Sequence, residues 1–291
     1  METSVLAYQT EHPAALSLKK IVVGYDASPS SERALHDAIT IGKQFQSEIV
    51  LVQVNSPDDY LASSFEAARG ETTQQFHDLQ SLRQGLANQG LRSRSIVRNG
   101  IVGDTLFNVC CDEDADLLLL GAYGYRQRDR KTLGSTAEFL LRAVPCPTLT
   151  YGPDVCSTLD SLSQRGPVLV PISLPCNEEY LEMAARIAQL FGTGVEILHV
   201  AGQRPPAVLR ELEDECQKLS YRLRQGGIHA RWSLYCGLPE NVIRNRAGEI
   251  DSPFILMPLR WGHELSSMTS DNVAAHVIRC SKVPVMTYKT S

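Results

Sequence analysis

The chain has 291 residues, of which 43% are hydrophobic and 21% charged, with a net charge of −5 and a pI near 5.8. This length suits two domains better than a single core. The acidic balance excludes a general affinity for nucleic acid or for anionic membranes, and no apolar run approaches the length of a membrane span.

A first unit of alternating strands and helices is expected from residue 20 onward. Residues 1–19 lack the basic start and apolar centre of a signal peptide and are expected to form an N-terminal tail. The run KIVVGYD is short, apolar and rich in β-branched residues, which predicts a buried strand. The predicted strands of this unit cover 20–26, 47–54, 92–100, 116–121 and 146–151. Apolar residues at helical spacing predict helices over 32–45, 61–89, 104–111 and from Ser135 onward.

A second unit repeats the first from residue 167. The predicted strands are PVLVPIS, VEILHV, ARWSLYC, FILMP and VPVMTY, and the last closely parallels CPTLTY of the first unit. Helices are predicted over 177–191 and 208–227. The expected domains are 20–152 and 167–291, joined by a Ser/Asp/Gly-rich linker at 153–166.

Alternating strands and helices predict an α/β fold with two tandem, doubly wound, parallel five-stranded sheets of Rossmann-like type. Ligands bind such sheets beyond the carboxyl ends of the strands, where the winding reverses. We therefore expect Asp26, Val54, Gly103 and the segment 121–124 to lie close together. The carboxylate of Asp26 either caps the next helix near residues 28–31, or binds a ribose or helps to hold Mg²⁺.

The stretch GAYGYRQRDRKTLGST, residues 121–136, carries the clearest binding signal. Glycine permits a positive φ and lets a ligand approach the backbone, and small residues that open a helix leave N–H groups available for an anion. The stretch therefore predicts a phosphate cradle, formed by Gly121, Gly124, Gly134 and Ser135, with Thr136 in the first helical turn. The alternative is a strand, a solvated loop and a helix capped by Ser135. The basic loop 126–131 either clamps a phosphate or is simply solvated.

On these residues the chain resembles the universal stress protein family in its tandem two-domain form, strongly over 20–151 and weakly over 167–289. The pattern Gly-x2-Gly-x9-Gly-Ser/Thr of the ATP-binding members is complete at the cradle. The family's aspartate after the first strand falls on Asp26, and its adenine-contacting valine falls on Val54. The resemblance implies the universal stress protein fold, ATP bound with Mg²⁺ to which Asp26 contributes indirectly, and a role in stress response or signalling.

The second unit departs from this pattern. Aligned backwards from VPVMTY, the positions of Gly121 and Gly124 become Pro258 and Trp261, and those of Gly134 and Ser135 become Asp271 and Asn272; Ser173 replaces Asp26. Proline has no N–H to donate, tryptophan fills a cleft and aspartate repels phosphate. The sequence thus predicts one ATP per chain and a degenerate second domain with a structural or regulatory role.

Two functions from different classes remain open at this point. The first is an ATP-binding signalling protein, and the second is a nucleotide-independent interaction module with a vestigial cradle. No general base accompanies the cradle, so efficient catalysis is not expected, while slow hydrolysis or autophosphorylation on Ser135 or Thr136 stays open. The eight scattered cysteines suit a reduced cytoplasm, and they and the seven histidines form no zinc pattern. The pair Cys110–Cys111 is either redox-active or buried on a helix.

The last predicted strand of each unit, 146–151 and 283–288, is expected at a sheet edge if the strand order follows the family. Pairing the two edges would remove unpaired backbone groups and create a pseudo-twofold dimer within one chain. We therefore predict that the two strands run antiparallel, with Leu149 and Met286 near the axis. The ladder should be short because Pro147 and Pro284 lack a donor. A homodimer of whole chains stays open.

Overall fold

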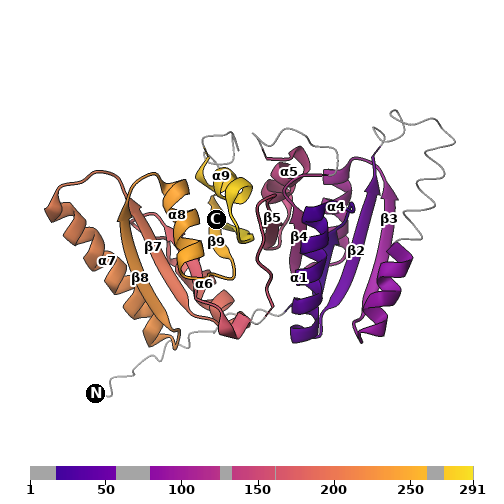
Figure 1. Cartoon of the computed structure of the whole chain (residues 1–291), viewed down its shortest axis with the longest axis horizontal. Helices are drawn as coiled ribbons and strands as arrows, with labels where there is room; N and C mark the ends of the chain where they lie inside the picture. Colours follow the sequence, from indigo (N-terminus) through magenta and orange to yellow (C-terminus); the bar gives the residue numbers. More distant parts are fainter. Residues whose placement is uncertain (1–17, 57–78, 125–132, 161, 261–271, 291) are drawn as a thin grey trace, which may run out of the picture.

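The computed structural model describes residues 18–56, 79–124, 133–160, 162–260 and 272–290. Nearly all of the predicted tail, most of the predicted helix 61–89, the basic loop, Trp261 and Asp271 lie outside these residues. Figure 1 shows the two halves of the chain side by side. The first half contains β1 (Lys20–Gly24), α1 (Pro29–Phe45), β2 (Glu48–Asn55), β3 (Ser93–Asn99), α4 (Val102–Asp112), β4 (Leu117–Gly121), α5 (Ser135–Ala143) and β5 (Thr148–Tyr151).

The second half follows the same succession of elements. It contains η1 (Leu162–Gln164), β6 (Val168–Ile172), α6 (Glu178–Phe191), β7 (Val195–Ala201), α7 (Pro206–Gln225), β8 (Ala230–Cys236), α8 (Pro239–Glu249), β9 (Ile255–Arg260), α9 (Val273–Cys280) and β10 (Val285–Thr290). The described strands form one sheet in the order β3-β2-β1-β4-β5-β10-β9-β6-β7-β8, and neighbours within each half are parallel. The predicted α/β fold is confirmed, and the two five-stranded halves join into a single ten-stranded sheet.

The two halves meet through β5 and β10, which pair antiparallel at the centre of the molecule (Figure 1). Met286 lies opposite Leu149, and both side chains are fully buried. This is the pairing that the sequence predicts. The ladder spans three residue pairs and includes neither proline; the carbonyls of Pro147 and Pro284 accept instead from Leu118 N of β4 and Ile255 N of β9.

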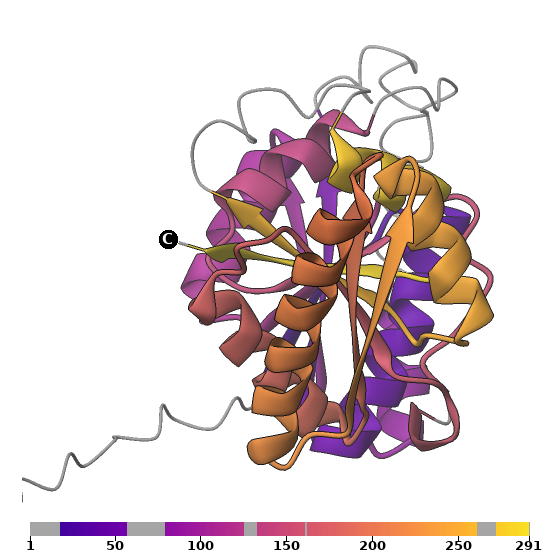
Figure 2. The same ribbon diagram turned by 90° about the vertical axis from the view of Figure 1, so that its left-hand side faces the viewer.

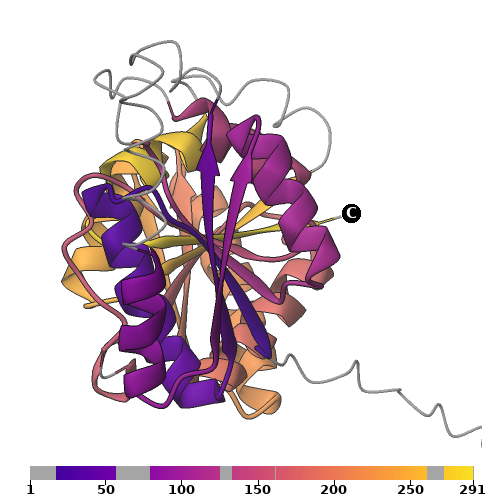
Figure 3. The same ribbon diagram turned by 90° about the vertical axis from the view of Figure 1, so that its right-hand side faces the viewer.

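Alternation along the strands gives the sheet two apolar faces. In β1, Ile21 and Val23 join a core cluster with α1, α6, α7 and the helical residues 79–88, whereas Val22 joins a second cluster with α4, α5, α8 and α9. Figure 2 shows α7 and α8 on opposite sides of the outer strands of the second half, and Figure 3 shows α1 and α4 in the same relation in the first half. Both clusters run across the central strand pair, so the halves share their cores.

The segment predicted as a linker is packed against both halves. Leu159 is buried, and its N–H donates to Oδ1 of Asp37 in α1 over 3.0 Å, while Tyr151 donates to the other oxygen of this carboxylate over 2.8 Å. A Cβ at Gly152 would lie 2.2 Å from the carbonyl oxygen of Ile278, so glycine is required for this close approach. The boundaries at 152 and 167 remain predictions. Among the described residues, no helix has the length and apolarity to cross a membrane.

Candidate functional site

The predicted cradle lies at the carboxyl end of β4, beside β1, where the winding of the first half reverses. Gly121 is the last residue of β4. The N–H of Ala122 then donates to the carbonyl of Tyr151 over 2.8 Å, and the N–H of Gly134 donates to the carbonyl of Ala122 over 3.1 Å. The backbone on either side of residues 125–132 is therefore tied together, and Gly134 is held next to the end of β4.

Helix α5 starts directly from this point. Its N-cap residue is Gly134, and no side chain caps it within the described residues. Ser135 is the first helical residue and is exposed, while Thr136 is half-buried. The alternative prediction, in which Ser135 caps the helix, is wrong by one residue. A helix that begins with glycine leaves its first-turn N–H groups to solvent or to an anion, and its dipole favours negative charge there.

The carboxylate of Asp26 is oriented by the turn between β1 and α1. Its Oδ1 accepts from the N–H of Ser28 over 3.0 Å, and Ser28 is the residue that caps α1, accepting from Ser31 N over 3.2 Å. Asp26 thus shapes the turn but is not itself the cap. Its Oδ2 lies 3.4 Å from where a Cβ of Gly124 would be, so the structure brings Asp26 and Gly124 together.

Gly121 and Gly124 of the predicted cradle differ in how much space a side chain would have. A Cβ at Gly121 would lie 2.8 Å from Cβ of Ser30, so the packing of α1 on the strand end excludes a side chain there. Among the described residues, a Cβ at Gly124 would meet only Asp26 within 4 Å. Neither glycine has a positive φ, so conformational freedom is not the reason for either. Space for the start of α1 explains Gly121, whereas the described part of the chain puts only the carboxylate of Asp26 in contact with a Cβ at Gly124.

The other two predicted residues lie on the α4–α5 side of the sheet. Val54 is half-buried near the end of β2 and packs on the core cluster of that face. Gly103 lies in the first turn of α4, where a Cβ would be 2.8 Å from the ring of Phe139 in α5. Helix packing therefore accounts for Gly103 without a ligand.

Gly100 is a residue of this edge that the sequence reasoning did not single out. It follows β3 with φ of 151°, and its N–H donates to the carbonyl of Asn55 over 3.1 Å. Gly237 has the same role after β8, with φ of 149° and a 3.3 Å bond to the carbonyl of Ala201. The sequence could have revealed this glycine, because RNG at 98–100 and YCG at 235–237 end with a glycine at the same place in the two repeats.

The second half has different residues at the positions aligned with the predicted cradle. Pro258 pairs with Tyr288 as Gly121 pairs with Tyr151, which supports the alignment of Pro258 with Gly121. Strand β9 continues for two residues beyond Pro258, to Arg260, whereas β4 ends at Gly121. The contrast at the strand end is therefore a difference in backbone path as well as in side chains.

Helix α9 also begins differently from α5. Asn272 is its N-cap, and the Oδ1 of this residue accepts from the N–H groups of Ala274 and Ala275 over 2.9 and 3.3 Å. Asn272 therefore takes the cap position that Gly134 holds in α5, one residue away from the sequence alignment. The amides that could bind an anion are occupied by a side chain of the protein itself.

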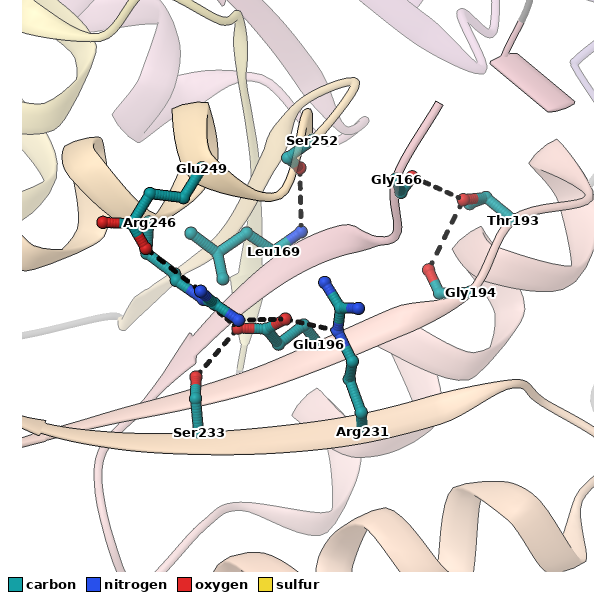
Figure 4. Close-up of polar contacts among 10 residues, drawn as sticks. All are labelled: Gly166, Leu169, Thr193, Gly194, Glu196, Arg231, Ser233, Arg246, Glu249 and Ser252. Atoms are coloured by element: carbon teal, nitrogen blue, oxygen red, sulfur yellow. Dashed lines mark hydrogen bonds and ion pairs between the residues drawn. The ribbon is translucent and has the colours of Figure 1, made fainter. Parts of the chain in front are cut away.

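The second half has instead a buried ionic cluster centred on Glu196 in β7 (Figure 4). This carboxylate is fully buried and accepts from Nε of Arg231 at 2.5 Å, Oγ of Ser233 at 2.9 Å and Nε of Arg246 at 2.5 Å. Burial acts to raise the pKa of Glu196, but the hydrogen bonds from Arg246, Ser233 and Arg231 outweigh it and the pKa is lowered. The cluster ties β7 to β8 and α8 within the layered core, so its role is structural.

No group of three or more His, Cys, Asp or Glu side chains suited to a metal ion occurs in the described part of the chain. Magnesium commonly takes one or two carboxylates together with phosphate oxygens and water. The carboxylate of Asp26, beside Gly124, is of the chemical type that such a site would use.

Part of the chain is similar to a known protein family. Residues 17–151 match the model of the Universal stress protein family. A universal stress protein of Synechocystis is 28% identical over 146 residues, which cover 45% of this chain and 95% of that protein. One of Methanocaldococcus jannaschii is 24% identical over 136 residues, which cover 45% of this chain and 80% of that protein.

Solved structures resemble the whole chain. A universal stress protein from Archaeoglobus fulgidus matches 95% of this chain and 98% of its own, with a TM-score of 0.74 and 20% identity. A putative universal stress protein from Pseudomonas aeruginosa matches 94% of each chain, with a TM-score of 0.66 and 18% identity. At these identities the likeness shows the fold, and residues 17–151 resemble the domain that the family model describes.

Proposed function

We propose that the chain binds ATP together with Mg²⁺ at the carboxyl edge of its first half and acts as a nucleotide-binding stress-response or signalling protein. The second half is then the degenerate copy of a tandem pair, a structural or regulatory partner in an internal pseudo-dimer. The observation that carries the proposal is the contrast between the halves. The first half has Gly121 at the end of β4 and a glycine cap at Gly134, where the second half has Pro258 and the self-capping Asn272.

Each residue of the site has a definite task in this proposal. Backbone N–H groups near Gly124 and at the start of α5 bind the phosphates, and the exposed hydroxyl of Ser135 adds a further bond. Asp26 helps to hold Mg²⁺, directly or through water, between its carboxylate and the phosphates. Val54 offers an apolar surface to the base. The site binds and orients; no described side chain is placed as a general base for rapid hydrolysis.

A nucleotide-independent interaction module is the second candidate, and one observation favours it. Packing against Ser30 and Phe139 accounts for Gly121 and Gly103 without any ligand. The two functions differ in a simple measurement, equilibrium dialysis of the full chain against labelled ATP with Mg²⁺ or with EDTA. The proposal predicts saturable binding that weakens in EDTA. Absence of saturable binding in both conditions would leave the interaction module as the better account.

A further inference from the structure

Four residues other than glycine have a positive φ in the described part of the chain. They are Ala27, Gln46, Asp114 and Asp251, with φ of 58°, 56°, 47° and 50°. A left-handed backbone brings Cβ too close to a carbonyl oxygen, so it is unfavourable for L-residues and least so for asparagine and aspartate. Each such residue needs a structural reason, and those without one are concentrated at functional sites.

Three of the four lie at the carboxyl end of a helix, where a left-handed residue is an ordinary way to end the helix. Gln46 is the C-cap of α1, and its N–H donates to the carbonyl of Gly42. Asp114 and Asp251 directly follow the C-cap residues of α4 and α8. Ala27 differs, because it lies between β1 and the start of α1 and ends no helix.

The backbone of Ala27 joins two sets of hydrogen bonds that shape the turn around Asp26. On one side, the N–H of Ser28 donates to Oδ1 of Asp26 over 3.0 Å. On the other side, the N–H of Asp26 donates to Oγ of Ser31 over 3.4 Å, and this hydroxyl donates to the carbonyl of Ser28 over 3.0 Å. Ser28 and Ser31 are buried, so both ends of the turn are fixed to the start of α1.

Side-chain packing does not explain the conformation of Ala27, because this residue is exposed. The turn uses Oδ1 of the neighbouring Asp26, whereas Oδ2 lies 3.4 Å from the place of a Cβ on Gly124 and so faces the predicted cradle. In the second half, Ser173 takes the place of Asp26, and none of residues 173–176 has a positive φ. The unfavourable backbone therefore occurs in the half that carries the carboxylate.

We propose that Ala27 is a positioning residue of the nucleotide site, whose left-handed backbone holds the carboxylate of Asp26 toward Gly124 and so makes the site selective for ATP that carries Mg²⁺. The inference rests on the proposed function and adds a residue that acts through Asp26. A carboxylate that is fixed in advance loses little freedom when it binds the metal, so the metal complex binds more tightly. Without the metal, the same fixed charge repels the phosphates, which weakens the binding of free ATP.

The test is calorimetric titration of the full chain with ATP, once in Mg²⁺ and once in EDTA, which gives the selectivity as the ratio of the two dissociation constants. We expect a ratio of about tenfold or more for the unmodified chain, and one within about twofold of unity for Ala27→Val. A β-branched residue resists a positive φ, and at this exposed position it changes the backbone preference without a packing conflict. Ala27→Gly should keep the ratio of the unmodified chain, because glycine accepts this φ.

The matched control is Gln46→Val, because Gln46 is also exposed and has nearly the same φ at the other end of α1. It should lower the melting temperature about as much as Ala27→Val does, and it should keep the ratio of the unmodified chain. Asp26→Asn should by itself remove the difference between Mg²⁺ and EDTA. Adding Ala27→Val to Asp26→Asn should then change the ratio no further, since Ala27 acts through that carboxylate.

Several results would overturn the positioning role while ATP binding itself stands. They are a ratio near unity in the unmodified chain, a ratio that survives Ala27→Val or Asp26→Asn, and a ratio that is lost equally in Gln46→Val. The result for Asp26→Asn decides the matter even if Ala27→Val fails to fold. Absence of saturable binding by the unmodified chain in both conditions would overturn the proposed function, and the positioning role with it.

Discussion

Three glycines of the first half differ in whether packing alone explains them. A Cβ at Gly121 or Gly103 would lie 2.8 Å from a neighbouring side chain. A larger residue at either position would therefore disturb the fold, and its effect on ligand binding could not be separated from that disturbance. Gly124 is exposed, has no positive φ and would place a Cβ in ordinary contact with Asp26. It is therefore the position where a side chain can obstruct the phosphates without straining the backbone.

We predict that Gly124→Val weakens ATP binding by at least about tenfold, a loss of about 1.4 kcal/mol, while the melting temperature stays close to that of the parent. The matched control is Gly202→Val, which places the same side chain after β7 of the second half, where a Cβ would meet nothing within 4 Å. Calorimetric titration of both variants checks the prediction. Equal affinity in Gly124→Val and the parent would remove Gly124 from the site.

At the scale of elements, Glu196 holds two strands and a helix together by charge. Its pKa is lowered in the folded chain, so its contribution to stability is present above the unfolded pKa and is lost as the pH falls through the lower, folded value. The buried carboxylate receives two arginines, and removing one member of such a cluster leaves uncompensated charge.

We predict that Glu196→Gln lowers the free energy of unfolding by about 3 kcal/mol at neutral pH, and that the deficit shrinks as the pH falls below the usual glutamate range. Glu249→Gln is the control, because Glu249 also pairs with Arg246 but is 56% exposed, and it should cost less than about 1 kcal/mol. Urea unfolding across pH measures both. A deficit that is equally large for the two variants, or that grows in acid, would contradict this account of the cluster.

For the whole molecule, the central strand pair decides whether the halves act as one body. Leu149 and Met286 face each other there and are fully buried. Replacing both with aspartate would bury two unpaired carboxylates between the halves. Arg165 in the packed linker segment offers trypsin a site that is protected by bonds to the carbonyl of Thr158 and to Asp251.

We predict that Leu149→Asp/Met286→Asp lowers stability by more than about 4 kcal/mol and that trypsin then cuts after Arg165 before other sites. The control, Ile101→Asp/Leu238→Asp, changes two apolar residues at equivalent places in the halves that are 66% and 62% exposed, and should leave cleavage unchanged. Limited proteolysis followed by mass spectrometry reads out both. Unchanged protection of Arg165 in the buried variant would show that the strand pair does not hold the halves together.

The sequence predicts the features of the fold and of the candidate site that depend on local patterns, and it does not predict those that depend on distant contacts. The strands follow from short apolar runs that repeat, and the meeting of Leu149 with Met286 follows from two edges that need a partner, whereas the strand order was expected only through the resemblance to a family. The packing of Gly121 on Ser30 and the approach of Gly152 to Ile278 depend on segments that are distant in sequence. No pattern of spacing reveals them.

The central claim is that one half of the chain binds nucleotide and the other does not. Isothermal titration of the full chain with ATP and Mg²⁺ tests it most directly, because the stoichiometry counts the sites. The account predicts close to one ATP per chain, since no described side chain caps the start of α5 while Asn272 occupies the amides of α9. A stoichiometry near two, or no binding at all, would contradict it.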